Sequence, residues 1–527
     1  MTGGLRRALV AIAAALALAD ASIVALALPP ILVEFNTSIT GVAAIVGVYA
    51  LVLALTLATR VKGAWGMAVF AAGSAGCALA PSLTVLLVFR AVQAVGAGAA
   101  LLTAYEVLDA GGSPAGRRWW LGAALIGTAA GPAIGGVLTE VFDWRAIFVF
   151  QVPFALAATP AAWGGERTDT SDGTQASYRS LAALAFTAAA FTAVLFLLVL
   201  ELVAGFAISP LRAALGVSIL PLAALAAAAI PGEPNGRALG GAILLVGGAG
   251  ALAFLPAPSI AWTIVPQLLA GAGMGLALPA LSPERNVQEA ARTLVARHAG
   301  IVLVLAILAP VANARLTDAT DTAILQGASL VLDAQIDPLK KLQLAPSLLD
   351  EVDASDPRGQ LRTAVASKRA DFAPDTAVYD RLGDRLDDVV VAAIENAFRV
   401  SYLIAAALGL LGVAMLIGAW RRPAIWLAAA ASAGAIVIYA VEHDAEKPPP
   451  VTLQDPCLER PIPSTGGISG AIQLQALKQL DQAACKVGST REELALAIFN
   501  ADRAQRFQKK YGTNPRGLLS ILSLLGG

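Results

Sequence analysis

Long apolar segments recur along nearly the whole chain, and they constrain its fold more than any other feature. About 20 apolar residues cross a bilayer as an α-helix, so a segment of that length predicts a membrane span. Thirteen segments meet this test within a few residues: 7–31, 40–59, 64–80, 83–108, 117–140, 145–163, 181–206, 210–231, 238–256, 259–281, 293–314, 397–420 and 423–441. Backbone polar groups must be satisfied inside the bilayer, so the pattern predicts an all-α polytopic membrane protein.

The composition points to the same class of protein. Of 527 residues, 57% are hydrophobic and only 14% are charged, which is too little charge to cover a soluble protein of this size. The 37 basic and 37 acidic residues balance, so no excess of positive charge indicates a nucleic-acid partner. Two histidines are too few for a histidine-built metal site. We therefore expect membrane lipids around the chain, and no nucleic acid, metal or cofactor.

The first apolar segment has the features of a signal peptide. Arg6 and Arg7 precede an apolar run that ends in small residues, and cleavage near Ala19 to Ala21 is one interpretation. The run continues to Ile31, however, which is long enough to span a membrane. We expect it to remain as the first helix.

Basic residues in the short loops predict the orientation. Lys and Arg gather in cytoplasmic loops of membrane proteins. In a chain with thirteen spans, the short loops of one side have few cations. The other side carries Arg6, Arg7, Arg60, Lys62, Arg117, Arg118, Arg167, Arg179, Arg237, Arg285, Arg292, Arg297, Arg421 and Arg422. The N-terminus is therefore expected in the cytoplasm and the C-terminus outside.

Two polar segments are then expected on the outer face. Residues 317–396 form a polar loop with helical stretches, and residues 442–527 form a tail that opens with an extended proline-rich linker. Two helices are expected in the tail. The second starts at a capping box of Thr490 and Glu493, continues as one apolar stripe to Tyr511 and ends at Gly512.

Cysteines add one expected crosslink. Cys457 and Cys485 are the two cysteines of the tail, and an oxidising compartment permits them to form a disulfide. A two-cysteine metal site is the alternative, but no histidine or third thiol is nearby in sequence. Cys77 lies in the third span and is expected to be a small packing residue.

Four motifs follow one another in the first half of the chain. They are residues 20–31 (DASIVALALPPI), 89–98 (FRAVQAVGAG), 127–136 (GTAAGPAIGG), and 143–148 (DWRAIF) with Pro153 after them. They are similar to the helix 1 signature, motif B, motif C and the start of helix 6 of the major facilitator superfamily. Residues 15–155 thus resemble its drug:proton antiporter branch, of the actinobacterial type.

This resemblance implies a fold of two six-helix bundles in a bacterial plasma (inner) membrane. The N-terminal bundle is residues 1–163, and a cytoplasmic linker, 164–180, follows. The C-terminal bundle is 181–316 together with 397–420. The external loop domain (317–396), an additional span (421–441) and the external tail domain (442–527) are departures from a twelve-helix exporter.

Charged residues inside apolar segments are the candidates for the transport site. Unpaired charge at membrane depth costs several kcal/mol, so such residues face a cavity or one another. Asp20 and Arg90, with Gln93 of motif B, are the first candidates for lining a cavity and responding to protons. A static ion pair is the alternative interpretation. Glu201 is a second cavity candidate, whereas Glu106 is expected to snorkel and His298 to be interfacial.

Motif C supplies the candidate gating element. Pro132 interrupts the helical hydrogen-bond ladder, and the flanking glycines form a smooth groove for a neighbouring helix. The candidate gating motif consists of Gly127, Gly131, Pro132, Gly135 and Gly136. A kink that serves packing alone is the alternative.

One family motif is reduced in this chain. Motif A, the loop between helices 2 and 3 that helps to latch the two halves, is represented here by residues 59–63 (TRVKG), and its aspartate is missing. The family's switching mechanism therefore cannot be carried over unchanged.

Together these features predict a secondary active transporter, with proton-coupled export of a small hydrophobic or amphiphilic molecule by alternating access. The proton is the expected coupling ion. The alternatives are a non-transporting scaffold or receptor, whose external protein partner would bind through 317–396 or 442–527, and a handover transporter for an envelope lipid or precursor. The absence of a Walker loop and of a catalytic triad pattern argues against an ATP-driven pump or another enzyme.

Overall fold

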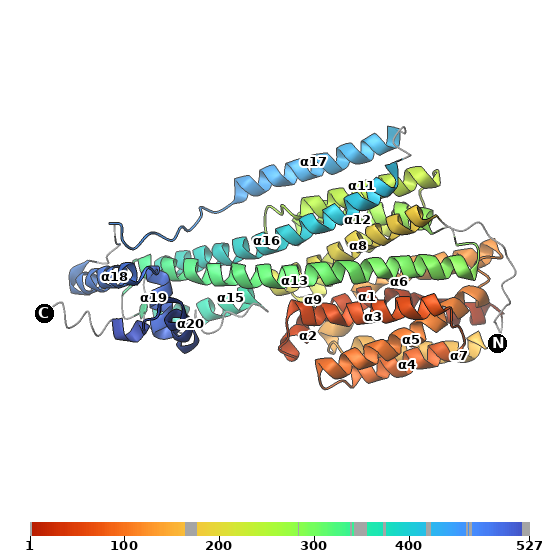
Figure 1. Ribbon diagram of the computed structural model, residues 1–527, viewed down its shortest axis with the longest axis horizontal. Coiled ribbons are helices and arrows are strands. Elements are labelled where there is room, and N and C mark those ends of the chain that lie inside the picture. The colour runs from red at the N-terminus through yellow and green to blue at the C-terminus, as the bar shows by residue number, and fades with distance from the viewer. Residues whose placement is uncertain are drawn as a thin grey trace. The chain divides into compact units, whose positions relative to one another are not determined.

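A computed structural model describes residues 3–163, 177–282, 284–337, 340–341, 356–372, 376–417, 423–459, 462 and 466–518. These residues form helices joined by turns and extended linkers, and none of them is in a β-strand (Figure 1). The all-α fold predicted from the apolar segments is confirmed. Of the predicted cytoplasmic linker, residues 164–176 lie outside the described residues.

The chain divides into two compact units, which are described separately. Unit 1 comprises residues 1–204, 208–314 and 398–446. Unit 2 comprises 205–207, 315–397 and 447–527. Two α-helices, α13 (Val287–Asp333) and α16 (Thr376–Met415), contribute residues to both units, and so does the π-helix η1 (Glu201–Gly205), whose last residue belongs to unit 2.

The N-terminal half of unit 1 is a helical bundle. Its helices are α1 (Gly3–Ala25), α2 (Leu28–Glu34), α3 (Ile39–Thr59), α4 (Trp65–Ala78), α5 (Leu83–Val107), α6 (Pro114–Val141) and α7 (Ala146–Ala162). Helix α1 packs against α6 and α7, and α4 packs against α5 and α7. Small residues permit these close approaches, because a Cβ atom on Gly96 of α5 would lie 2.2 Å from the Phe70 nitrogen of α4.

The C-terminal half of unit 1 contains the remaining membrane helices. They are α8 (Tyr178–Leu200), the π-helix η1 (Glu201–Gly205), α9 (Pro210–Val217), α10 (Ile219–Ala228), α11 (Pro234–Leu252), α12 (Ile260–Leu281), the unit 1 parts of α13 and α16, and α17 (Pro423–Glu446). Helix α17, the predicted additional span, packs against α11, and its Ser432 hydroxyl donates to the Ile243 carbonyl at 3.0 Å.

Several helices are suited to a bilayer. Among the described residues, eight helices are long and apolar enough to cross a membrane, judged by length and composition. Two shorter apolar helices, Trp65–Ala78 and Ala146–Ala162, coincide with the third and sixth predicted spans. The polytopic character is thus confirmed, whereas the number of thirteen spans stays a prediction.

Two predicted spans are interrupted in the structure. The span 7–31 is α1 followed by α2, and Pro29 and Pro30 lie where the second helix starts. The span 210–231 is α9 followed by α10, with Ser218 between them and Pro221 in the first turn of α10. Proline has no N–H to donate to the preceding turn, which explains why neither span is one regular helix.

The predicted loop domain 317–396 is built differently from expectation. Its two helical stretches are confirmed as helical, but they are extensions of α13 and α16 and not separate helices. No proline or glycine stands between Ala314 and Gly327, so nothing in the sequence ends α13 at the predicted boundary. A further helix, α15 (Pro357–Lys368), and the 3₁₀ turn η2 (Arg369–Phe372) lie between the two long helices in sequence.

The tail of unit 2 contains three helices instead of two. They are α18 (Gly467–Val487), α19 (Arg491–Phe499) and α20 (Ala501–Tyr511). The single helix predicted from Thr490 to Tyr511 was wrong, because Asn500 has an extended backbone and its side chain accepts from the Arg503 N–H at 3.0 Å, which starts α20.

The predicted ends of this segment are confirmed. The Thr490 hydroxyl accepts from the Glu493 N–H at 3.1 Å, although the Glu493 carboxylate accepts from Tyr511 at 2.7 Å instead of completing a capping box. Gly512 ends α20 with φ of 70°, in the left-handed region that glycine adopts readily.

The predicted disulfide is present in unit 2. Cys457 in the extended linker is bonded to Cys485 near the end of α18, and the two lie 28 residues apart in sequence. Beside this bond, Ala484, Leu494 and Phe507 belong to the apolar core that joins the three tail helices. The disulfide therefore ties the linker to the tail domain.

We expect Cys457→Ser to lower the free energy of unfolding of unit 2 by about 2–4 kcal/mol, because the crosslink restricts the unfolded chain. Limited proteolysis of the full-length protein would measure this as faster cleavage between residues 447 and 518. Reduced wild type should match the variant, and Cys77→Ser should not change the cleavage in unit 2. Equal resistance of the oxidised wild type and Cys457→Ser would contradict the prediction.

Candidate functional site

A buried ion pair lies in the middle of the N-terminal half. Asp20 comes from α1 and Arg90 from α5, and a carboxylate oxygen of Asp20 is 2.6 Å from Nη1 of Arg90. Neither side chain is exposed. Arg90 also donates to the Ile45 carbonyl at 3.0 Å, and its guanidinium stacks over the Tyr49 ring at 4.3 Å. The two residues singled out in the sequence are therefore direct partners.

Polar side chains from other helices complete this cluster. Gln93 accepts from Arg90 at 2.7 Å and donates to Gln151 of α7 at 2.9 Å. The Gln151 amide in turn donates to Asp20 at 3.3 Å, and Gln93 also reaches the Ser74 hydroxyl of α4 at 2.9 Å. The cluster thus joins α1, α4, α5 and α7. Gln151, Ser74 and Tyr49 were not singled out in the sequence, because uncharged polar residues carry no strong signal in apolar segments.

Glu201 lies in the C-terminal half. It is the first residue of the π-helical turn that follows α8, and its carboxylate accepts from the buried Tyr402 hydroxyl of α16 at 2.7 Å. Such π-helical turns are frequent at functional sites. The sequence-predicted acids Asp20 and Glu201 therefore belong to different halves of the bundle.

Small cavities lie between the two halves of unit 1. One of about 50 Å³ is lined by residues of both halves. They include Ser22 and Tyr49 from the first half and Thr192, Arg297 and His298 from the second. A neighbouring cavity of about 30 Å³ shares Leu18 and Arg297 with it.

Asp20 and Arg90 do not line either cavity. The Arg90 guanidinium lies over the ring of Tyr49, and Tyr49 is one of the residues that line the first cavity. Arg297 and His298, by contrast, take part in the lining directly. His298 is buried among protein atoms, with its Nδ1 2.8 Å from the Leu294 carbonyl oxygen, and its place at the membrane interface stays a prediction.

Helix α1 lines cavities along most of its length. A groove of about 470 Å³ runs along Ala8, Ile12 and Ala15 of α1 and along the first turns of α6, next to Arg118. Leu18 of α1 then borders the two smaller cavities, and Ser22 and Ala25 border the larger of these. The helix that carries Asp20 therefore borders the space between the halves, and a ligand bound there would contact it.

A buried carboxylate connects the two halves beside the smaller cavity. Glu284, between α12 and α13, accepts from Nε1 of Trp120 on α6 at 2.5 Å and from the Thr293 hydroxyl at 2.9 Å. The Tyr105 hydroxyl of α5 donates to the Glu284 carbonyl at 3.1 Å. We call Glu284, Trp120 and Tyr105 the inter-half latch. Sequence reasoning missed it, since Glu284 lies outside the apolar segments.

Burial sets the protonation of this latch. Desolvation raises the pKa of Glu284 to about 7, and the hydrogen bonds from Thr293 and Trp120, with the charges of Arg117 and Arg297, oppose that rise. A carboxyl with a pKa near neutrality changes charge within the physiological pH range.

The remnant of motif A stays within the N-terminal half. Lys62 pairs with Glu106 of α5 at 2.5 Å, and the Gly63 N–H donates to the Thr103 hydroxyl at 2.8 Å. Glu106 therefore holds the loop between α3 and α4. These contacts do not reach the C-terminal half, whereas those of Glu284 do.

Motif C packs tightly against helices of both halves. On α6, Gly127, Gly131 and Gly135 face α1, and a Cβ atom added to any of them would lie 2.1–2.4 Å from an atom of α1. Gly136 faces the other half, where an added Cβ would lie 2.0 Å from the Ala214 Cβ of α9. Pro132 lies within α6, between these glycines. The motif thus lets α6 approach α1 and α9 closely.

We expect Gly131→Ala to lower the stability of the N-terminal half by about 1–3 kcal/mol, because the added methyl overpacks the contact with Ser22. Gly122→Ala on the same helix is the matched control, since an added Cβ there meets no atom within 4 Å. Thermal unfolding of the two purified variants measures the difference. Equal melting temperatures would show that the close approach is not required.

Among the residues that the structure describes, no group of three or more His, Cys, Asp or Glu side chains is placed to hold a metal ion. The polar groups at and beside the cavities between the halves include a carboxylate, a guanidinium group, an imidazole and hydroxyls. Such groups exchange protons and bind polar parts of a ligand.

Known proteins resemble this chain over limited stretches. No family model matches the sequence. An uncharacterised MFS-type transporter, YvkA of Bacillus subtilis, is 35% identical over 156 residues, which is 26% of this chain and 34% of the relative. The multidrug resistance protein Stp of Mycobacterium tuberculosis is 34% identical over 149 residues, covering 25% of this chain and 28% of Stp.

A third relative is the tetracenomycin C resistance and export protein of Streptomyces glaucescens. It is 33% identical over 156 residues, which is 27% of this chain and 29% of the relative. The chain thus spans about a third of the length of the curated relatives it matches.

Solved structures resemble the chain over a larger part. The crystal structure of a bacterial homologue of the human lysosomal transporter Spinster, in an inward-facing and unoccupied conformation, aligns with a TM-score of 0.51 and 16% identity. The alignment covers 80% of this chain and 99% of the other. This likeness concerns the fold. The chain is therefore a multi-pass membrane protein with a transporter fold, and its predicted resemblance to the drug-export branch of the major facilitator superfamily is confirmed.

Proposed function

We propose that this protein is a secondary active transporter that exports a small hydrophobic or amphiphilic molecule by alternating access. The observation that carries the proposal is the pair of cavities between the halves. Arg297 and residues of α1 line both, and His298 lines the larger one. Binding at the interface of two helical halves is the usual arrangement in such transporters. The named functions of the relatives, multidrug resistance and export of tetracenomycin C, support this direction of transport.

The cavity sizes support a cycle in which the halves separate. Pockets for drug-sized ligands measure roughly 300–1,000 Å³, whereas the two cavities measure about 50 and 30 Å³. A substrate therefore enters only after the halves move apart on one side. The apolar part of the lining, with Leu18, Phe191 and Leu195, favours a hydrophobic substrate over a sugar.

We assign the gate to the inter-half latch. The latch consists of two hydrogen bonds: Trp120 donates to the Glu284 carboxylate, and Tyr105 donates to the Glu284 backbone carbonyl. When both break, α5 and α6 can separate from the loop between α12 and α13. This contact takes the place of the half-to-half contact that the reduced motif A no longer supplies. The orientation predicted from loop cations puts the latch on the cytoplasmic side.

We assign proton coupling to Asp20 with Arg90. A proton on Asp20 would cancel its charge and release Arg90, which stacks on a ring that borders the cavity. The proton is the coupling ion in this proposal. Glu201 with Tyr402 is the corresponding candidate in the second half.

The competing functions are a scaffold or receptor without transport, and handover of an envelope lipid or precursor. An external protein partner would bind unit 2 in the first case. The disulfide in unit 2 supports an external, oxidising location for that unit. The cavities between the halves favour transport over a scaffold.

A cell assay tests the proposal. The protein would be produced in a bacterial strain lacking its own drug pumps, and efflux of a panel of fluorescent amphiphilic dyes would be measured with and without an uncoupler. We expect uncoupler-sensitive efflux of at least one dye. Cells that carry the empty vector are the control. No efflux of any dye above that of empty cells would favour the scaffold.

A further inference from the structure

One cation between the halves of unit 1 stands without a partner. The Arg297 side chain comes from α13 and lines both small cavities. Within the described part of the chain, its guanidinium makes neither a hydrogen bond nor an ion pair. A charge inside an apolar helix bundle is costly unless a partner or a polar cavity compensates it. Arg297 is therefore a binding group that is available to a ligand.

The acids nearest to Arg297 already have partners. The charge of Asp20 is compensated by Arg90, and neither residue lines a cavity between the halves. Glu284 lines the smaller cavity together with Arg297, but both of its carboxylate oxygens accept hydrogen bonds from other side chains. Among the described residues that line the larger cavity, none is an acid. The lining of that cavity thus carries a positive charge without a counterion.

A second donor lies in the lining of the larger cavity. The Thr192 hydroxyl of α8 has no hydrogen-bond partner in the described part of the chain, whereas the other two side-chain hydroxyls of this lining donate to backbone carbonyls of α1. A carboxylate accepts several hydrogen bonds, and the planar guanidinium of arginine matches its geometry. Arg297 and Thr192 are therefore suited to a ligand carboxylate.

His298 supplies a different kind of group. Its Nδ1 lies 2.8 Å from the Leu294 carbonyl oxygen, which can only accept, so this nitrogen carries the proton. The other nitrogen of the neutral ring, Nε2, is then an acceptor. It suits a hydroxyl of a ligand and not a carboxylate, so the preference for negative charge comes from Arg297.

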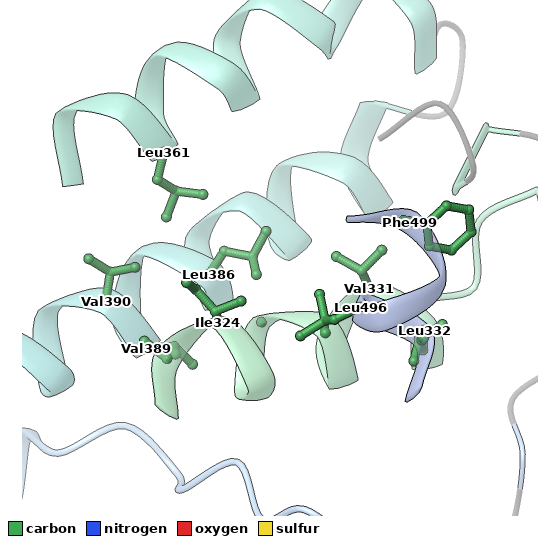
Figure 2. Close-up of a pocket in the computed structure, with 13 residues that line it drawn as sticks. Ile324, Val331, Leu332, Leu361, Leu386, Val389, Val390, Leu496 and Phe499 are labelled. Atoms are coloured by element: carbon green, nitrogen blue, oxygen red, sulfur yellow. The ribbon is translucent and has the colours of Figure 1, made fainter. Parts of the chain in front are cut away.

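The polar lining separates this site from the pocket of unit 2. Every residue that surrounds that pocket is apolar, as Figure 2 shows for the labelled side chains of α13, α15, α16 and α19. Such a lining contains no group that selects the charge of a ligand. Between the halves of unit 1, by contrast, Arg297 and Thr192 lie among apolar residues such as Leu18, Phe191 and Ile301.

We propose that the molecule bound between the halves is an amphiphilic anion, in which a hydrophobic body carries one carboxylate. The carboxylate pairs with the Arg297 guanidinium and accepts from the Thr192 hydroxyl, and the hydrophobic body packs against the apolar lining. This inference rests on the proposed transport function, because the two cavities admit a whole substrate only after the halves move apart.

Equilibrium binding to the full-length protein in nanodiscs of zwitterionic lipid tests the proposal. Three fluorescent probes share a dansyl group on the same short alkyl chain and end in a carboxylate, a carboxamide or an ammonium group. Binding to nanodiscs without protein is subtracted. We expect the carboxylate probe to bind about tenfold more tightly than the carboxamide, and the ammonium probe to bind least, because the arginine pairs with the charged form alone.

Variants assign this preference to Arg297. Arg297→Gln should weaken binding of the carboxylate probe about tenfold and leave the carboxamide unchanged, since glutamine keeps hydrogen-bonding capacity without the charge. Arg297→Lys should restore most of the preference. Arg292→Gln is the matched control, because Arg292 is a partly buried cation on the same helix that lines neither cavity.

Several results would overturn the anion proposal. They are equal binding of the three probes by wild type, binding of none of them, and an unchanged preference in Arg297→Gln. The last result would mean that Arg297 acts only on the protonation of Glu284.

The efflux assay separates this proposal from the proposed function. Arg297-dependent binding of the carboxylate probe, without uncoupler-sensitive efflux of that probe or of any dye, would reject transport and keep the anion site. Efflux of neutral and cationic dyes, together with binding that ignores the charge of the probe, would reject the anion site and keep transport.

Discussion

Asp20→Asn is expected to lower the free energy of unfolding by about 3–5 kcal/mol, because it leaves the Arg90 guanidinium buried without its charged partner. Both side chains are fully buried, and the pair is hydrogen-bonded to Gln93. Denaturant titration of the purified protein in mixed micelles would measure the change. Glu106→Gln is the control, since its partner Lys62 is partly exposed, and its cost should be smaller than that of Asp20→Asn.

The double variant Asp20→Asn with Arg90→Met separates a coupling role from a static one. Removing both charges leaves no uncompensated buried ion, so most of the lost stability should return. We expect transport to remain absent in this variant, because no group in the cluster can then bind and release a proton. A double variant that is stable and transports normally would establish a static ion pair. A stable Asp20→Asn protein would contradict the energetic argument itself.

Glu284→Gln is expected to remove the pH dependence of the inter-half latch. Burial raises the pKa of the Glu284 carboxyl from its ordinary value of 4.5 to about 7. Glu284 therefore binds its proton more tightly in the closed latch than in an open state in which its carboxyl is exposed to water. This contribution to closure is fully present below pH 4.5 and is lost as pH rises through 7. Glutamine resembles the protonated carboxyl, so the variant should stay closed throughout.

Distances between spin labels would measure this opening. The labels would be attached to cysteines introduced at Arg118 on α6 and Asn235 on α11, which are exposed and lie in different halves. The native cysteines would not compete for the label, because Cys77 is buried and the other two form a disulfide. From pH 5.5 to 8.5, the ratio of open to closed wild type should rise about thirtyfold, if the open form has the ordinary carboxyl pKa. The fraction of molecules with the longer distance between the two labels should therefore increase from pH 5.5 to 8.5.

Two variants sharpen the interpretation of these distances. Trp120→Phe removes the N–H that Glu284 accepts and should favour the longer distance at every pH, with the pH response retained. Glu284→Gln should show the shorter distance without a pH response. A wild-type distribution that does not change with pH, or an unchanged response in Glu284→Gln, would remove Glu284 from the gate.

The local features of this fold could be predicted from sequence because they depend on neighbours along the chain. Apolar length predicted the membrane helices, and the caps at Thr490 and Gly512 followed from residue type. The Cys457–Cys485 bond followed from there being two cysteines in one predicted compartment. The break between α19 and α20 at Asn500 was not predicted, because the apolar stripe continues on both sides of it. The Asn500 side chain caps a backbone N–H of the next helix, and a single asparagine within an apolar stripe does not by itself indicate such a cap.

The candidate site was predictable only in part, because its contacts join residues far apart in sequence. The charges of Asp20 and Arg90 are conspicuous within apolar segments, so their pairing could be proposed. Trp120 and Glu284 are 164 residues apart, and neither helix periodicity nor a motif indicates which helix faces meet. The cavity position of Arg297 and His298 was likewise hidden, because loop cations at a predicted span end are normally interfacial.

The most direct test of the central claim is proton movement in proteoliposomes. An imposed pH gradient would be followed with an internal pH-sensitive dye while a compound exported in the cell assay is added. We expect wild type to dissipate the gradient on addition of the compound, and the stable double variant at Asp20 and Arg90 not to do so. Equal rates in wild type, the double variant and protein-free liposomes would contradict proton-coupled transport by this chain.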